Sequence, residues 1–326
     1  MGIARFIGPR EATLLAVIGV AIVAFATLSP VYLSVNNLNA VIRNSTELLA
    51  IALGLTFVMA IGGIDVSIGV AMGIAAIAIG KLLMLGIPSL VAAAAGPVVG
   101  VTLGAVTGAV IVYGRIPAIV ATIGLLGIFR MVVFALLGGS WLSGLPSGLS
   151  AIFTYKIGGL LPVSYIFILA AYLVAFAIFR LTPLGTHLLA IGNSEERARL
   201  SGIAINRVRM AAYLICGGLA GMAATFYIAN YRNVETGVGT TLAMDAIAAV
   251  VLGGTSIMGG RASLLGTVLG VFLIRILQNG FTIVGLPSLW QPVVTGGVLI
   301  LSLIAEQVVS GLRRRTRTAP SKRAAA

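Results

Sequence analysis

Residues 190–209 read AIGNSEERARLSGIAINRVR, and residues 210–228 read MAAYLICGGLAGMAATFYI. The first stretch holds six charged side chains, whereas the second stretch, of 19 residues, holds none. A helix that crosses a bilayer core about 30 Å thick needs roughly 17 to 25 mostly apolar residues. This sharp change therefore predicts a membrane-spanning helix that follows a water-exposed connection.

The whole chain has the composition of a membrane protein. Of its 326 residues, 59% are hydrophobic and only 9% are charged, and the mean hydropathy is +1.13. A soluble domain carries about a quarter charged residues, so this chain cannot present an ordinary water-facing surface. A single cysteine, Cys216, and a single histidine, His187, exclude a disulfide framework and a thiolate or imidazole metal site. We expect no metal and no catalytic residues, and we interpret His187 as an ordinary loop residue.

Apolar runs predict about ten helices, because lipid offers no hydrogen-bonding partner to an irregular backbone. They lie near residues 12–29, 46–63, 66–86, 89–113, 118–137, 163–180, 210–228, 241–258, 263–282 and 289–308. The third and eighth runs are interrupted by Gly-Gly pairs and polar residues. The expected fold class is an all-α polytopic membrane protein with one transmembrane domain over residues 1–326. The first run also fits a secretory signal peptide, but its length favours an uncleaved helix.

Most of the 21 Lys and Arg residues fall in connections on one side of this arrangement. With the N-terminus in the cytoplasm, the connection 181–209 and the basic tail 309–326 both lie inside. The outside exceptions are Arg43, Lys81, Lys156 and Arg232. Basic residues are enriched in cytoplasmic loops, so we expect both termini in the cytoplasm. The net charge of +13 then reflects contact with a lipid bilayer, and no nucleic acid partner is expected.

The connection 181–209 contains a predicted short helix, from Ser194 to Ser201. Asn193 is a favourable N-cap, and Glu196, three residues later, completes a pair that resembles a capping box. Gly202 suits the left-handed position that ends a helix. Both ends of the short helix are thus specified by the sequence.

The side chains of this predicted helix favour a docking role. Glu195 and Arg199 stand four residues apart in the favourable order, and Leu200 and Ile203 supply a small apolar face. A loop that only had to stay in water would not need a capped helix. We interpret the helix as an element that fits a groove on a cytoplasmic partner.

The chain lacks the phosphate-binding loop of an ATPase. Its nearest approach to GxxxxGK[ST] has Gly80-Lys81 followed by Leu82, and Ala75 occupies the position of the first glycine. The energy for any transport must therefore come from a partner or from an ion gradient. An ion-coupled secondary transporter would need ionisable residues within its spans.

Ionisable and polar residues in or beside the runs are few. The candidates for a translocation path are Asp65, Ser67, Asp245 and Arg130. Asp65 either lines a path or caps the helix that begins near Val66. Asp245 lies deep in an apolar run, which favours a path-facing or ion-paired role, with Arg130 or Arg275 as its partner. Asp65 and Asp245 are also the candidate ion site of a secondary transporter.

Glycine patterns predict how the helices pack. Gly96, Gly100, Gly104 and Gly108 recur on one face of the fourth run, and Gly266 and Gly270 repeat the spacing in the ninth. Small residues at this spacing let helix backbones approach closely. The stretches IGGIDVSIG (61–69) and LGGTSIMGG (252–260) also resemble one another, which suggests two related halves with a path between them.

Four motifs together carry a family resemblance. They are AIGGIDVSIG (60–69), GRIPAIVATIGLLGIFR (114–130), AIGNSEERARLSGI (190–203) and AMDAIAAVVLGGTSIMGG (243–260). With them, over nearly its whole length, the chain resembles the permease subunits of bacterial ABC sugar importers of the ribose, xylose and arabinose class. Within this class it is most similar to permeases for autoinducer-2, and next to those for rhamnose.

The resemblance implies a type II importer permease of about ten helices in the bacterial inner membrane. Its implied partners are a dimer of ATPase subunits, which would hold the ATP and Mg²⁺, a second permease copy or paralogue, and a periplasmic binding protein. The implied cargo is a small hydroxylated solute, and no cofactor is implied on this chain. The helix in 181–209 would be the coupling helix, with contacts through Ala190, Gly192, Asn193, Glu195, Glu196, Arg199 and Gly202. The family loop often reads AxGGNxxAAxxSGI, from which this chain departs at Glu196 and Arg197.

Overall fold

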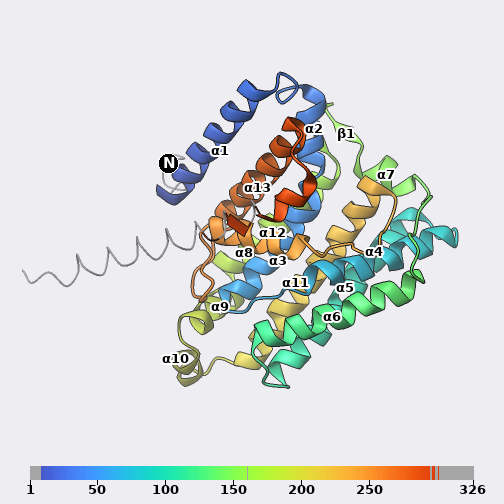
Figure 1. Cartoon of the computed structure of the whole chain (residues 1–326). Helices are drawn as coiled ribbons and strands as arrows, with labels where there is room; N and C mark the ends of the chain where they lie inside the picture. Colours follow the sequence, from blue (N-terminus) through green and yellow to red (C-terminus); the bar gives the residue numbers. More distant parts are fainter. Residues whose placement is uncertain (1–8, 160, 294–295, 298–299, 301–326) are drawn as a thin grey trace, which may run out of the picture.

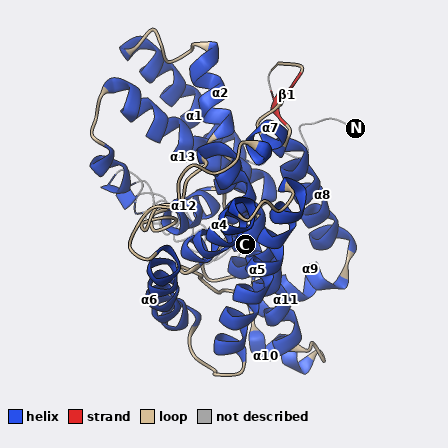
Figure 2. Cartoon of the chain, turned by 90° about the vertical axis from the view of Figure 1, so that its right-hand side faces the viewer, coloured by secondary structure: helices blue, strands red, loops and turns tan. Residues whose placement is uncertain are grey.

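The computed structural model describes residues 9–159, 161–293, 296–297 and 300. Over these residues the chain is almost entirely helical, which confirms the all-α fold (Figures 1 and 2). The helices are α1 (Pro9–Leu28), α2 (Val35–Arg43), α3 (Thr46–Ala60), α4 (Ile68–Met84), α5 (Ser89–Val112), α6 (Ala118–Leu137), α7 (Gly148–Phe153), α8 (Ser164–Leu181), α9 (Pro183–Asn193), α10 (Glu195–Leu200), α11 (Ile205–Tyr231), α12 (Leu242–Leu252) and α13 (Leu264–Val284). The other elements are the antiparallel pair β1 (Lys156–Ile157) and β2 (Leu161–Pro162), and the 3₁₀ turn η2 (Ser288–Trp290).

Seven helical segments among the described residues are long and apolar enough to cross a membrane. They are α1, the nearly continuous α2 and α3, α5, α6, α8, α11 and α13. Helices α4 and α12 are apolar but shorter, with 17 and 11 residues. Each of these elements except α2 matches a predicted run. The last predicted run, 289–308, lies largely outside the described residues, as does the tail 309–326, so the count of ten stays a prediction.

The eighth predicted span is wrong in its second half. Helix α12 ends at Leu252, and the chain from residue 253 to residue 263 is irregular. Gly254, Gly259 and Gly260 adopt positive φ angles of 98°, 86° and 78°, a conformation that a right-handed helix cannot include. The chain therefore leaves α12 as an irregular connection, in which Thr255 is buried and Met258 is 85% exposed.

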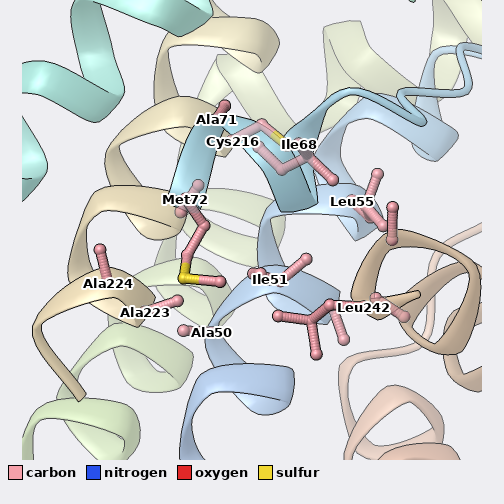
Figure 3. Packing of buried hydrophobic residues seen from close by; sticks show 14 of the residues in the cluster. Ala50, Ile51, Leu55, Ile68, Ala71, Met72, Cys216, Ala223, Ala224 and Leu242 are labelled. Atoms are coloured by element: carbon pink, nitrogen blue, oxygen red, sulfur yellow. The ribbon is translucent and has the colours of Figure 1, made fainter. Parts of the chain in front are cut away.

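Helix α3 forms the centre of the bundle. All of its residues are buried, and it packs against α8, α11, α12 and α13. Ala50, Ile51 and Leu55 of α3 lie beside Met72 of α4 and Ala223 of α11 (Figure 3). A helix that is apolar all round is stable only when other helices cover every face, which the sequence of α3 permits.

Helix α1 joins this bundle at its edge. Leu14, Ile18 and Phe25 form a second apolar cluster with Leu273 and Ile276 of α13. The remaining faces of α1 are largely exposed. The first apolar run therefore packs on α13 as a peripheral helix.

The predicted glycine stripe is the contact surface between α5 and α11, which confirms its packing role. A Cβ placed on Gly100 would collide with the carbonyl oxygen of Gly217, and one on Gly96 with that of Gly221. The second pattern has the same role, because a Cβ on Gly270 would collide with the carbonyl oxygen of Ala249 in α12. Close backbone approach of this kind is how helices associate in lipid.

The connections between helices sort onto two faces. What we call the basic face carries the connections 113–117, 182–204 and 253–263, and the opposite face carries 29–45, 85–88, 138–163 and 232–241. In Figure 1, α10 marks the first face at the bottom, and α2, α7 and β1 mark the second at the top. Contacts agree, because Asn193 reaches Gly260 on the basic face and Asn230 reaches Arg43 on the opposite one. This is the alternation that the predicted spans require.

Candidate functional site

The charged connection on the basic face folds into two helices, α9 and α10 (Figure 1). The short helix α10 matches the prediction, but its N-cap is Ser194 and not Asn193. The Ser194 hydroxyl accepts a hydrogen bond from the backbone N–H of Arg197 at 3.4 Å. Asn193 instead ends α9, a helix that sequence reasoning missed. Because α9 continues through Asn193, the cap position of α10 falls one residue later, on Ser194.

The C-terminal end of α10 is closed as predicted. Gly202 has a φ of +77°, in the left-handed region. The N–H of Ile203 donates to the carbonyl of Ala198 at 3.1 Å, and the N–H of Gly202 donates to that of Arg199 at 3.0 Å. These two bonds form a Schellman motif, which satisfies carbonyls that the helix end would otherwise leave open.

A carboxylate ties α10 to α11. Glu195 pairs with Arg199 at 2.8 Å, as predicted, and also with Arg209 of α11 at 2.6 Å. Partial burial raises the pKa of the Glu195 carboxyl, but the charge of Arg209 and the hydrogen bonds from both arginines outweigh it and hold this pKa below its usual range. Glu196 and Leu200 point outward, and Leu200 is 83% exposed. The helix is therefore anchored on one side and free on the other.

The last turn of α9 meets both glycine-rich breaks of the bundle. A Cβ on Gly192 would collide with the carbonyl oxygen of Ala60 and the backbone nitrogen of Gly260. Gly260 itself donates its N–H to the carbonyl of Ala60 at 2.9 Å. The Asn193 amide donates to the carbonyls of Leu189 at 2.9 Å and Gly260 at 3.3 Å. We call this contact of residues 60–62, 192–193 and 258–260 the glycine junction.

The glycine junction explains why three separate motifs are glycine-rich. Residues 60–62 follow α3, residues 258–260 follow α12, and residues 192–193 end α9. Only residues without a side chain let these three backbones touch. The sequence showed each motif separately but gave no sign that they meet.

Comparison with known proteins places the chain in a transporter family. The sequence pattern of the family described as "Branched-chain amino acid transport system / permease component" matches residues 37–303. The chain belongs to this permease family. The match runs from α2 through α13 and includes the whole glycine junction.

Relatives of this permease are described as permeases for the import of autoinducer 2 and of ribose. It is 33% identical over 295 residues to the autoinducer 2 import system permease protein of Salmonella typhi, which covers 90% of this chain and 85% of that protein. It is 32% identical over 290 residues to the ribose import permease protein of Escherichia coli K12, which covers 88% of this chain and 90% of that protein. No solved structure gave a significant match. These relatives support the resemblance that the four motifs predicted.

The path candidates of the permease have different surroundings. Asp65 and Ser67 lie at the start of α4, where the Asp65 carboxylate accepts hydrogen bonds from the Ser67 N–H at 2.9 Å and the Ser67 hydroxyl at 2.6 Å. Both side chains are buried. This geometry favours the helix-start role of Asp65 over a path-lining role.

Asp245 belongs to a buried polar network near the opposite face. Its carboxylate accepts a hydrogen bond from Gln278 at 3.0 Å, and Gln278 accepts one from Arg275 at 3.0 Å. Arg275 in turn lies 3.7 Å from the Glu47 carboxylate. Of the two predicted partners, Arg275 is thus linked to Asp245 through Gln278, whereas Arg130 is exposed on α6.

The centre of this network is Glu47, which sequence reasoning did not include among the path candidates. It is buried in the first turn of α3, and its carboxylate accepts hydrogen bonds from Tyr231 at 3.2 Å and Asn230 at 3.3 Å. The signal available was an acidic residue beside an apolar run, but its basic partner lies far along the chain in α13. Sequence spacing cannot identify the two partners of an ion pair that lie so far apart along the chain.

The described part of the permease holds no group of three or more His, Cys, Asp or Glu side chains that suits a metal ion. Cys216 is buried in α11, and His187 lies in α9. Asp65 lies four residues before Gly69 of α4, where an added Cβ would collide with Gly239 and meet the backbone nitrogen of Ala243 at the start of α12. The two carboxylates nevertheless have separate hydrogen-bonding partners, Ser67 for Asp65 and Gln278 for Asp245.

Proposed function

We propose that this chain is the transmembrane subunit of an ATP-binding-cassette importer, and that α9 and α10 dock on a partner ATPase. The observation that carries the proposal is the glycine junction, which connects an exposed, capped helix directly to two breaks in the bundle. A displacement of α10 would be transmitted to α3 and α12 without passing through a flexible linker. The residues assigned to docking are Ala190, Gly192, Asn193, Glu195, Glu196, Arg199 and Gly202.

The remaining parts of the transporter lie on other chains. A dimer of ATPase subunits would bind ATP and Mg²⁺, since this chain has no phosphate-binding loop. A second permease copy or a paralogue would complete the path, and a periplasmic binding protein would deliver the solute. The excess of arginine on the basic face supports a cytoplasmic location for this face, with the chain spanning the bacterial inner membrane and both termini in the cytoplasm.

The proposed cargo is a small hydroxylated solute, such as a monosaccharide or an autoinducer-2-like molecule. The names of the two relatives support this class. Few ionised side chains lie within the spans, which suits a neutral solute that must pass without binding tightly. Selection of one solute among many would then rest largely with the binding protein.

ATP binding would close the ATPase pair and carry the two coupling helices with it. Through the glycine junction this movement would rock α3 and α12, and the central path would open to one side and then to the other.

The test is uptake into proteoliposomes that hold the chain together with the ATPase and the binding protein encoded by neighbouring genes. Uptake of labelled ribose or autoinducer-2 should require both ATP and the binding protein. The double variant Glu195→Ala/Glu196→Ala should lose uptake while ATP hydrolysis continues and the chain stays in the membrane. The matched control, Glu235→Ala, removes an exposed carboxylate from the opposite face and should transport normally. Unchanged uptake in the double variant would refute docking through α10.

The alternative is an ion-coupled secondary transporter that uses Asp65 and Asp245. Its prediction is different, because the chain alone would then take up solute when a proton or sodium gradient is imposed. Each carboxylate already accepts hydrogen bonds from a different partner, Ser67 for Asp65 and Gln278 for Asp245, which argues against a shared ion site. Gradient-driven uptake without ATPase, abolished by Asp245→Asn, would replace the ABC proposal.

A further inference from the structure

A cavity of about 960 Å³ opens on the basic face beside the docking element. Its walls come from the break after α3, the connection between α5 and α6, helix α10 and the start of α11. Lining residues include Gly62, Arg115, Glu195, Arg199, Arg207 and Arg209. Ligand sites in proteins commonly measure about 300–1,000 Å³, so the cavity is large enough for a small molecule or a lipid headgroup.

The cavity is strongly basic. Four guanidinium groups and one carboxylate line it. Glu195 is already engaged by Arg199 and Arg209. Within the part of the chain that the structure describes, the side chains of Arg115 and Arg207 make no ion pair or hydrogen bond, and both are exposed. A cavity with this surplus of positive charge attracts an anion.

Two helix N-termini add to the attraction. Helix α6 begins after Pro117 and α11 begins after Ala204, and neither has a side-chain cap. Pro117, Ala118, Ala204 and Ile205 all line the cavity. The open N–H groups of a first helical turn and the positive end of the helix dipole both favour an anionic group. The arginines and the two helix N-termini therefore both favour binding of an anion in the cavity.

The position of the cavity suggests which anion it takes. Helix α5 ends at Val112 and α6 starts at Ala118, so the connection between them lies at a membrane boundary. Tyr113 is exposed there, as expected for an aromatic residue at the headgroup level. Ile119, Val120 and Ile123 of α6 are also exposed and continue away from the cavity into the apolar span. The basic cavity suits the charged headgroup of a lipid, and the exposed apolar face of α6 suits its acyl chains.

We infer that this cavity binds the headgroup of an anionic phospholipid, with Arg115 and Arg207 contacting the phosphate and the acyl chains lying along α6. Basic pockets between helices on the cytoplasmic side are suited to such headgroups. Because α10 and Arg209 form one wall, a bound lipid would brace the docking element against α11. The inference goes beyond the transport role and does not depend on it.

The experiment is native mass spectrometry of the full-length chain in detergent, titrated with phosphatidylglycerol or with phosphatidylcholine. The wild-type chain should retain phosphatidylglycerol in preference to phosphatidylcholine. Each of Arg115→Gln and Arg207→Gln should weaken phosphatidylglycerol binding by about fivefold, since one arginine near anionic lipid contributes about 1 kcal/mol. The matched control, Arg180→Gln, removes an exposed cytoplasmic-side arginine outside the cavity and should bind as the wild type does. Arg115→Lys should keep most of the affinity, which separates loss of charge from misfolding.

Four results would overturn the assignment. Equal retention of both lipids, or an equal effect of all three glutamine variants, would show that the cavity does not select an anionic headgroup. Soluble glycerol phosphate that binds as tightly as the lipid, with the same dependence on Arg115 and Arg207, would assign the cavity to a free phosphate. Arg115→Gln and Arg207→Gln could instead weaken association with the ATPase and leave lipid retention unchanged. This result would assign the cavity to an acidic surface of that partner.

Discussion

At the scale of single residues, the two neighbouring glutamates of α10 have different surroundings. Glu195 bonds to Arg199 and Arg209, whereas Glu196 is exposed and available to a partner. Sequence reasoning placed both in the docking motif without distinguishing them. The structure divides the roles, with Glu195 holding the helix in place and Glu196 facing outward.

This division predicts different effects of two matched variants. Glu195→Gln should loosen α10 from α11 and raise amide hydrogen exchange in residues 195–200 by about two- to fivefold, because partly exposed pairs contribute about 0.5–1 kcal/mol. Glu196→Gln should leave exchange unchanged but weaken ATPase docking. Hydrogen exchange of the purified chain measures the first effect, and pull-down of the ATPase measures the second. Equal exchange in both variants would contradict the anchoring role of Glu195.

The same residue predicts how α10 responds to pH. Because the folded-state pKa of Glu195 is held below its ordinary value, its contribution to stability is present above the unfolded pKa, about 4.3, and is lost as pH falls through the folded one. Exchange protection of residues 195–200 relative to Glu195→Gln should therefore be constant from neutral pH down to about pH 5 and disappear only in stronger acid. A loss of this difference near pH 6 would mean that another group controls α10.

At the scale of elements, helix α9 is the part of the docking region that contacts the bundle. Its last turn touches the break after α3 and the break after α12 through Gly192. Three elements that are distant in sequence thus form one mechanical contact.

A single methyl group should disturb this contact. Gly192→Ala places a Cβ against Ala60 and Gly260, and overpacking of this kind costs about 1–3 kcal/mol. We expect α9 to move away from the breaks, so that uptake falls more than ATP hydrolysis does. The control is Gly127→Ala in α6, where a Cβ meets no atom within 4 Å. Transport by Gly192→Ala at the wild-type rate would exclude the glycine junction from coupling.

At the scale of the whole molecule, the buried network of Glu47, Arg275, Gln278 and Asp245 connects α3, α12 and α13 near the opposite face. The glycine junction connects the ends of α3 and α12 near the basic face. The central helices are thus joined by polar bonds at one end and by close backbone contact at the other. This arrangement suits helices that must move as a unit.

Removing one charge of the network should destabilise the whole bundle. Glu47→Gln leaves the Arg275 guanidinium without its counter-charge, and breaking a buried pair costs about 3–5 kcal/mol. The double variant Glu47→Gln/Arg275→Met should lose less than the sum of the two single variants. The free energy of unfolding in detergent measures the difference, with Glu235→Gln as an exposed control. Strictly additive losses would show that the pair is not coupled.

The sequence by itself determined the features that depend on local order along the chain. Long apolar runs predicted the fold class and nine of the described helices, because burial in lipid requires a helix of a certain length. Gly202 and the Glu195–Arg199 spacing gave the end and one ion pair of α10, because caps and i, i+4 pairs involve near neighbours. The four motifs gave the permease family.

Only the tertiary structure decided what depends on segments that are far apart in sequence. The N-cap of α10 is Ser194 and not Asn193, because Asn193 belongs to the last turn of α9 and contacts Gly260. The tertiary structure ended α12 at Leu252, because the glycines that follow pack on other backbones. It also paired Glu47 with Arg275 and brought four arginines from distant segments around one cavity. Periodicity reports which face of a helix is apolar, but it carries no information about which distant segment covers that face.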